Sequence, residues 1–118
     1  MMAASAAARK LDDTLAALAD PSRRSVVDLL RRQPRRAGEL AEALSMSPPA
    51  MSRHLRVLRR TGIVEEEGLE HDARVRLYRL RPERFAELRD WLTEVESFWA
   101  GQLDAFREHA ERTRKRNR

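Results

Sequence analysis

Residues 38–58, with the sequence GELAEALSMSPPAMSRHLRVL, decide the fold of this chain. Apolar side chains recur at helical spacing over residues 37–44, Ser45-Met46 forms a turn, and a second helix begins after Ser47. Ser47 is a suitable N-terminal cap, and Pro48 suits the first helical position because no intrahelical N–H is lost there. Two helices joined by a tight turn predict a helix-turn-helix, which places its second helix in the major groove of DNA.

The second helix of this unit has an apolar side and a basic side. On a wheel of about 100° per residue, Met51, Leu55 and Leu58 point inward. The opposite side carries arginines, which are rarely buried, and Arg53 is placed to reach guanine. The alternatives are a merely solvated basic face and, for His54, a packing role within the protein. The predicted DNA-binding residues are Ser47, Pro48, Pro49, Ala50, Ser52, Arg53, His54, Arg56 and Arg60 of this helix, with Arg74 and Arg76 of the hairpin that follows.

The flanking sequence extends this unit to a winged helix. Residues 11–19 predict a helix. Asp20-Pro21 ends this helix and begins the next one, because Asp20 can cap a helix and Pro21 suits its first position. Gly62 is a good left-handed cap for the helix before it. Alternation over residues 63–80 predicts a two-stranded hairpin with a turn at Gly68 to Asp72, and a last helix runs from Pro82 to about Arg112.

The expected fold class is therefore mainly α with a small β-hairpin. It is a winged helix-turn-helix of about five helices and a two-stranded wing, forming a helix-mediated homodimer. We expect one domain over residues 9–111, a flexible N-terminus over residues 1–8 and a disordered basic tail over residues 112–118.

Charge is distributed unevenly along the chain. The formal net charge is +5, and residues 21–81 hold fourteen arginines and eight acids. Residues 82–111 hold three arginines and eight acids, and the tail is basic again. The middle of the chain is thus the expected polyanion-binding part, although a genome with many arginine codons is an equal explanation of the arginine content.

The order of elements resembles the ArsR family of bacterial winged-helix repressors. The segments that carry the resemblance are LADPSRRSVVDLL (Leu18 to Leu30), GELAEALSMSPPAMSRHLRVLRRTGIV (Gly38 to Val64) and RVRLYRL (Arg74 to Leu80), about half of the chain. The resemblance implies a homodimeric repressor that binds a double-stranded operator with two-fold symmetry, often its own promoter. The residues that match the family's recognition helix are Ser47, Pro48, Ala50, Ser52, Arg53, His54 and Arg56.

The chain departs from the metal-sensing members of that family. Ala41 and Ala43 stand where thiolate-sensing members carry Cys-x-Cys, and alanine cannot ligate. Zinc requires three or four N, O or S ligands, whereas the histidines, His54, His71 and His109, are scattered along the chain. We expect no metal and no cofactor, and the residues do not indicate a small-molecule inducer.

The last predicted helix carries five of the six aromatic residues. Its large apolar side chains recur at spacings close to those of a helix-packing seam. So small a chain cannot easily bury such a helix within itself, although folding back on its own core and lining a ligand pocket are the alternatives. The predicted dimer interface comprises Leu11, Leu15, Leu18, Leu88, Trp91, Leu92, Val95, Phe98, Trp99 and Phe106.

Other classes of function find less support. The chain has no Cys, no glycine-rich phosphate loop and no Ser-His-Asp arrangement, so we expect no enzyme. No apolar run approaches the roughly 18 residues that span a bilayer, and no signal peptide is apparent, so we expect a soluble cytoplasmic protein with no membrane partner. The acidic hairpin, with Glu65, Glu66, Glu67 and Glu70, supports the alternative of a winged-helix dimer that binds protein without specific DNA binding, unless these carboxylates pair with Arg74, Arg76 or Arg79.

Overall fold

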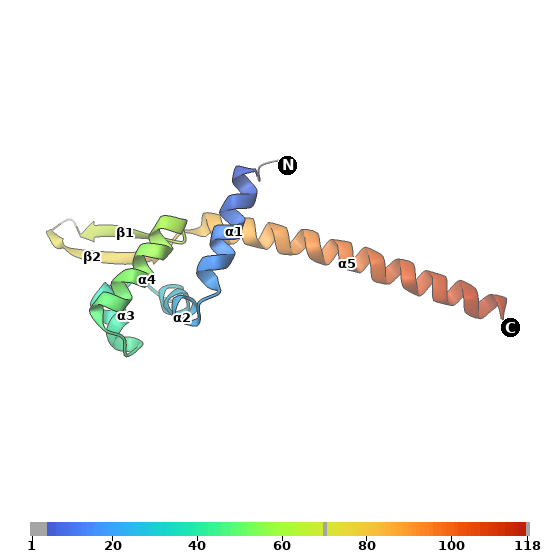
Figure 1. Ribbon diagram of the computed structural model, residues 1–118, viewed down its shortest axis with the longest axis horizontal. Helices are drawn as coiled ribbons and strands as arrows, with labels where there is room; N and C mark the ends of the chain where they lie inside the picture. The colour runs from blue at the N-terminus through green and yellow to red at the C-terminus, as the bar shows by residue number, and fades with distance from the viewer. Residues whose placement is uncertain (1–4, 70, 118) are drawn as a thin grey trace. The chain divides into compact units, whose positions relative to one another are not determined.

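The computed structural model describes residues 5–69 and 71–117. The chain divides into two structural units, Met1–Ala86 and Glu87–Arg118. The first unit holds a helix-turn-helix followed by a two-stranded wing, as the sequence predicts, and the long last helix begins in the first unit and forms the second (Figure 1).

Helix α1 (Ala6–Leu18) and helix α2 (Pro21–Leu30) meet at Asp20. The Oδ1 atom of Asp20 accepts hydrogen bonds from the backbone N–H of Ser22 at 2.8 Å and of Arg23 at 3.2 Å, which caps α2. These bonds, that of Arg23 first, hold the pKa of Asp20 below its ordinary value. Because α1 already begins at Ala6, it starts earlier than the predicted domain boundary at residue 9.

Two arginines of α2 reach back to the end of α1. Arg23 Nε donates to the carbonyl of Ala17 at 2.6 Å, and Arg24 Nη1 donates to those of Leu18 at 2.7 Å and Ala19 at 3.1 Å. The last carbonyls of a helix have no partner within it and carry partial negative charge, which guanidinium groups neutralise. These two positive charges, counted above toward a polyanion face, therefore serve a contact inside the protein.

Helix α3 (Ala37–Ala43) and helix α4 (Pro48–Thr61) form the helix-turn-helix. The turn requires a left-handed residue, Ser45, at φ 53°. Ser47 Oγ accepts a hydrogen bond from the N–H of Ala50 at 3.3 Å, which confirms the predicted cap of α4. Gly62 ends α4 at φ 83°, the left-handed conformation predicted for it.

The wing consists of β1 (Val64–Leu69) and β2 (Asp72–Leu80), paired antiparallel with Val64 opposite Leu80 and Glu66 opposite Tyr78. The predicted turn over residues 68–72 is too long, because Gly68 pairs with Arg76 and still belongs to the ladder.

A backbone bridge joins the wing to the loop between α2 and α3. The Arg35 N–H donates to the Tyr78 carbonyl at 3.1 Å, and the Tyr78 N–H donates to the Arg35 carbonyl at 2.8 Å. The sequence pattern did not indicate this pairing, because a single bridge leaves no alternation to detect.

The core of the first unit lies beneath α4. The predicted apolar stripe of this helix is fully buried, and it packs with apolar residues of the neighbouring elements. The buried apolar side chains of this core are Ala17, Val26, Leu30, Leu40, Ala41, Met51, Leu55, Leu58, Ile63 and Val64. The stripe thereby fixes which side of α4 remains outside.

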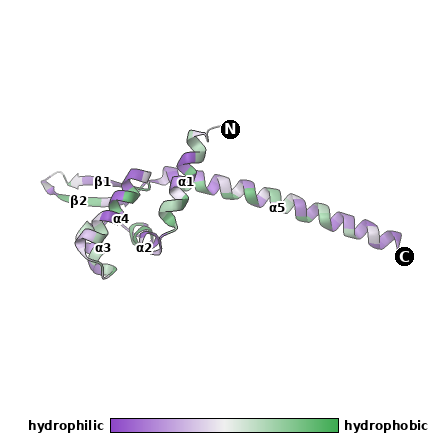
Figure 2. Cartoon of the chain, in the orientation of Figure 1, coloured by the Kyte–Doolittle hydropathy of each residue, from purple (hydrophilic) through white to green (hydrophobic). Residues whose placement is uncertain are grey.

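Helix α5 (Pro82–Arg116) continues four residues beyond the predicted end near Arg112. The segment over residues 112–116 is therefore helical, and the expectation of a disordered tail is wrong there; residue 118 lies outside the described part. Polar and apolar residues alternate along this helix (Figure 2). None of its described residues is buried. No helix in the described ranges is both long and apolar enough to cross a membrane.

Candidate nucleic-acid interface

The outer side of α4 is open to solvent. Ser47, Pro48, Pro49, Ser52, Arg53, Arg56 and Arg60 are exposed, and Ala50 and His54 are half-buried. The exposed set begins at the capped N-terminus, where small side chains allow close approach and free N–H groups favour an anion. The structure thus brings the nine helix residues predicted to bind DNA onto one element, with only Ala50 and His54 turned partly inward.

Arg53 and Arg56 have free guanidinium groups. Within residues 5–69 and 71–117, neither forms an ion pair or a side-chain hydrogen bond. Arg59 differs, because its Nη1 lies 2.7 Å from Glu66 Oε2 in the wing. Arg59 is thus already paired within the protein, whereas Arg53 and Arg56 remain available to an external anion.

His54 contacts α2. Its Nδ1 lies 3.5 Å from Nη1 of Arg23, whose Nε is held by the carbonyl of Ala17. The histidine therefore has a partner inside the protein, which is the packing role given above as the alternative to a DNA contact. Among residues 5–69 and 71–117, however, this partner occupies one of the two ring nitrogens and the other is left without one.

The wing carries a cluster centred on Glu66. Besides Arg59, its carboxylate pairs with Arg76 Nε at 3.3 Å and accepts a hydrogen bond from the Tyr78 hydroxyl at 3.3 Å. Partial burial of the phenol, followed by the charge of Glu66, raises the pKa of Tyr78. Arg76, predicted to bind DNA, is thus already paired within the wing, where it shares the carboxylate with Arg59.

The other acids of the wing are also paired. Arg79 contacts Glu65 across the ladder and Glu67 at 3.2 Å, and the hydrogen bond to Glu65 raises the pKa of Arg79. Arg74 is 93% exposed and lies 3.4 Å from Asp72, so it remains the wing cation that extends into solvent. Pairing across the hairpin removes most of the repulsion that the acidic run suggests. Glu70 lies outside the described residues.

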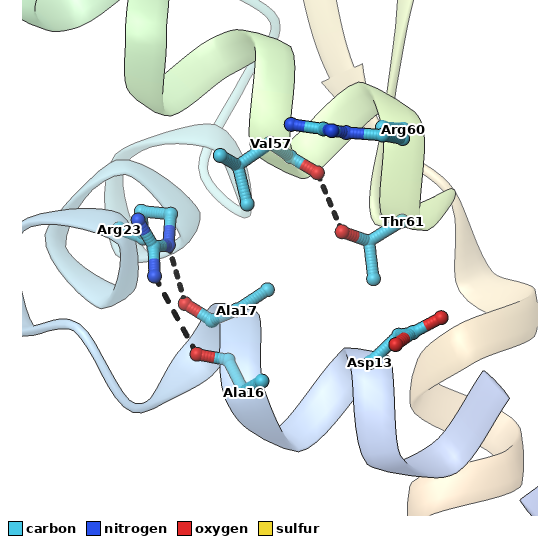
Figure 3. A pocket seen from close by; sticks show the side chains of 7 residues that line it. All are labelled: Asp13, Ala16, Ala17, Arg23, Val57, Arg60 and Thr61. Carbon is cyan, nitrogen blue, oxygen red and sulfur yellow. Dashed lines mark hydrogen bonds between the residues drawn. The ribbon is translucent and has the colours of Figure 1, made fainter. Parts of the chain in front are cut away.

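A cleft adjoins the basic side of α4 near its end. It has a volume of about 300 Å³ and is lined by α1, α2 and α4, with Ala16, Ala17 and Val57 as apolar walls. Arg23 points into this region while bound to the carbonyls of Ala16 and Ala17 (Figure 3). Arg60, predicted to meet DNA, extends over the same cleft.

The predicted dimer residues occupy two helices. In α1, Leu11 and Leu18 are half-buried and Leu15 is exposed. In α5, Leu88 and Val95 are half-buried, whereas the larger side chains are exposed by between 39% and 72%, namely Trp91, Leu92, Phe98, Trp99 and Phe106. Within the second unit the rings of Phe98 and Trp99 meet edge to face at 6.3 Å. Contiguous exposed apolar side chains of this kind are typical of interaction surfaces.

No metal-ligand cluster stands out in the described ranges: His, Asp and Glu side chains do not gather there in groups of three or more that could hold a metal ion. Ala41, at a position discussed above for thiolate ligands, is buried in the core.

Comparison with known proteins finds similarity over most of the chain. Residues 20–66 match the bacterial regulatory protein family arsR. The HTH-type transcriptional regulator Rv2034 of Mycobacterium tuberculosis (strain ATCC 25618 / H37Rv) is 37% identical over 98 residues, which cover 83% of this chain and 86% of that protein. The transcriptional repressor SdpR of Bacillus subtilis (strain 168) is 32% identical over 56 residues, 48% of this chain and 62% of that protein.

Solved structures agree with the sequence comparison. The ArsR-like transcriptional regulator from Rhodococcus sp. RHA1 superposes with a TM-score of 0.74 and 27% identity, covering 87% of this chain and 92% of that one. The match spans more than the helix-turn-helix, so the similarity includes elements on both sides of it.

Proposed function

We propose, since the chain belongs to the ArsR family of bacterial regulatory proteins, that it is a transcriptional repressor that binds double-stranded DNA in a sequence-specific manner through α4. The observation that carries this proposal is a pair of exposed arginines, Arg53 and Arg56, on a helix whose opposite side is fixed in the core. Neither arginine has an ion-pair partner in the part of the chain that the structure describes. SdpR, a relative, is named a transcriptional repressor. Such a protein acts in the cytoplasm, where bacterial DNA lies.

The proposed contacts divide into two kinds. Ser47 to Arg53 form the N-terminal half of α4, which enters the major groove, so Ser52 and Arg53 face base edges. Arg56 lies one turn further along and binds a phosphate, as does the exposed Arg74 of the wing. We assign Arg76 a smaller part than the sequence suggests, because Glu66 already holds it.

The regulator is proposed to act as a homodimer on an operator with two-fold symmetry. The exposed apolar side chains of α5 support this step, because a second copy of the same helix covers them without any further partner. Two copies of α4 about one helical turn apart, roughly 34 Å, require an inverted repeat. The rival role, a winged-helix dimer that binds protein alone, rested on the acidic hairpin, and the pairing of Glu65, Glu66 and Glu67 with arginines weakens it.

Binding to DNA from the chain's own upstream region tests the proposal. Arg53→Ala is expected to weaken binding by about 1–3 kcal/mol and to relax the preference at one base pair of each half-site. Arg56→Ala is expected to weaken binding to all sequences and to lower the slope of log K against log salt by about 0.9, one phosphate contact.

Arg89→Ala is the matched control, because Arg89 is an exposed arginine of the second unit whose loss removes the same charge. Electrophoretic mobility shifts and fluorescence anisotropy across salt concentrations measure both effects. An equal loss of affinity in all three variants, or an unchanged base preference in Arg53→Ala, would contradict the proposal that α4 recognises the base sequence.

A further inference from the structure

The contact between Arg23 and His54 favours one of the two positions that the proton can take on the imidazole ring. Arg23 Nη1 lies 3.5 Å from His54 Nδ1. A guanidinium group has donors only, so the nitrogen that faces it accepts. A neutral imidazole has one donor and one acceptor, and with Nδ1 accepting, the proton is on Nε2.

The guanidinium group is held in place before any DNA arrives. Arg23 Nε donates to the Ala17 carbonyl at 2.6 Å and Nη2 to the Ala16 carbonyl at 3.5 Å, and Nη1 lies 3.8 Å from Asp20 Oδ2. The side chain of Arg23 is only 18% exposed. Figure 3 shows the guanidinium group bound to the two carbonyls at the end of α1. With these nitrogens held, the group presents Nη1 to His54 in one orientation.

We propose that Arg23 is a positioning residue for DNA binding, which holds His54 as the Nε2–H tautomer so that this group donates to a phosphate oxygen. This inference rests on the proposed function. The two ring nitrogens point in nearly opposite directions, so a ring whose Nδ1 faces α2 directs Nε2–H away from it. His54 is half-buried and follows the exposed Arg53 directly, on the edge of the proposed DNA face. Arg23 itself does not touch the nucleic acid.

A double-mutant cycle on DNA affinity separates this role from helix capping. Arg23→Met removes the contact to His54 together with a cap of α1, whereas Arg24→Met removes only cap contacts, to Leu18 and Ala19. We expect Arg23→Met to weaken binding about three- to tenfold, the effect of one hydrogen bond. Arg24→Met changes affinity less than twofold, and Arg23→Met added to His54→Ala has no further effect.

Two substitutions of the histidine identify the nitrogen that acts. The amide nitrogen of Gln reaches the place of Nε2, whereas that of Asn reaches only the place of Nδ1. His54→Gln therefore retains most of the affinity and His54→Asn loses it. The salt slope of Arg23→Met stays at the wild-type value, because Arg23 does not touch the DNA and the neutral ring of His54 neutralises no phosphate charge.

Three results would overturn the proposal: an equal loss of affinity in Arg24→Met, a loss of affinity for Arg23→Met that persists in the His54→Ala background, or a salt slope lowered by about one contact.

Imidazole 15N spectra test the tautomer without DNA. We expect an unprotonated Nδ1 at His54 in wild type and Arg24→Met, with a resonance that shifts in Arg23→Met. A protonated Nδ1 in the neutral ring of the wild type also refutes the proposal. A wild-type protein that binds no DNA refutes the proposed function instead. The spectra then still show whether Arg23 contacts Nδ1 of His54.

Discussion

Single side chains at the base of the wing determine which arginines are free to meet DNA. Glu66 is 16% exposed and is shared by Arg59, Arg76 and Tyr78. A carboxylate with so little solvent is costly unless it is paired, so the cluster is held together by the charge it contains. Arg53 and Arg56 have no such neighbour in the described ranges, and this difference separates structural from available arginines.

Tyr78 reports on this cluster through its ionisation. Its pKa is raised above the ordinary value of 10.0, first by burial and then by Glu66. The neutral phenol therefore contributes stability that is fully present below pH 10.0 and is lost as the pH rises through the folded-state pKa. We expect the tyrosinate absorbance to titrate above that value, with a lower midpoint in Glu66→Gln.

The titration has a clean signal and a matched control. Tyr78 is the only tyrosine of the chain. Glu67 pairs with Arg79 and not with the phenol, so Glu67→Gln should leave the midpoint where it is. A midpoint that does not respond to Glu66→Gln would show that the carboxylate does not act on Tyr78.

The pKa of Asp20 is shifted in the opposite direction, so we expect its effect on stability at acid pH. Its pKa is lowered chiefly by the hydrogen bond from the N–H of Arg23. The charged cap therefore contributes stability that is present above the ordinary value of 3.8 and is lost as the pH falls through the folded-state pKa. Asp20→Asn keeps an acceptor but no charge, so its Tm should lie below that of wild type at neutral pH and approach it as the pH falls through the folded-state pKa of Asp20. A constant difference in Tm across this range would contradict the assignment.

At the scale of elements, the sequence predicts boundaries that depend on local chemistry. The caps at Ser47 and Gly62 and the proline at the start of α4 are set by the conformations that those residues favour. The extent of β1 through Gly68 and the length of α5 were missed. The end of a strand depends on where its partner strand ends. The cations from Arg114 to Arg116 favour the C-terminus of a helix, whereas the sequence pattern assigned these residues to a tail.

The end of α4 provides a direct test of these local rules. Gly62→Ala places a side chain at φ 83° and within 3.1 Å of Arg84 Nε, so we expect a loss of about 1–2 kcal/mol in the free energy of unfolding. Gly38, in α3, has open space around the added atom, and Gly38→Ala should stabilise by about 0.5–1 kcal/mol. Denaturant unfolding measures both; a Gly62→Ala protein as stable as wild type would be inconsistent with the left-handed cap.

The candidate site was predictable to the extent that it depends on one helix. The wheel places Arg53 and Arg56 outside because Met51, Leu55 and Leu58 must be inside. The contact of Arg23 with His54 joins residues 31 positions apart in the chain, and helical periodicity contains no information on such pairs. Arg23 and Arg24, which follow Asp20-Pro21, were nevertheless a usable signal for contacts to the end of α1. Cations near the C-terminus of a helix interact favourably with its last carbonyls.

For the whole molecule, the proposed dimer is the main prediction. Trp99 is 59% exposed on α5 although it is one of the largest apolar side chains. We expect Trp99→Ala to weaken the dimer by about 3 kcal/mol or more, the usual effect of removing a large buried aromatic group. Sedimentation equilibrium at low micromolar concentration measures the shift to monomer.

Gln102→Ala is the control, since Gln102 is an exposed polar residue of the same helix. A Trp99→Ala protein that remains as dimeric as the control would place the interface elsewhere. DNA binding should fall together with dimerisation, because two half-sites are read jointly.

The bridge between Arg35 and Tyr78 has a consequence for how the protein approaches a duplex. A hairpin tied only at its ends would bend freely about its base, but these two backbone bonds anchor β2 to the loop that leads into α3. A displacement of the hairpin therefore moves the loop before α3 with it, and the hairpin does not turn about its base as a hinge. The spacing between wing and recognition helix is set in advance, so little conformational entropy remains to be lost when the two engage adjacent stretches of the backbone.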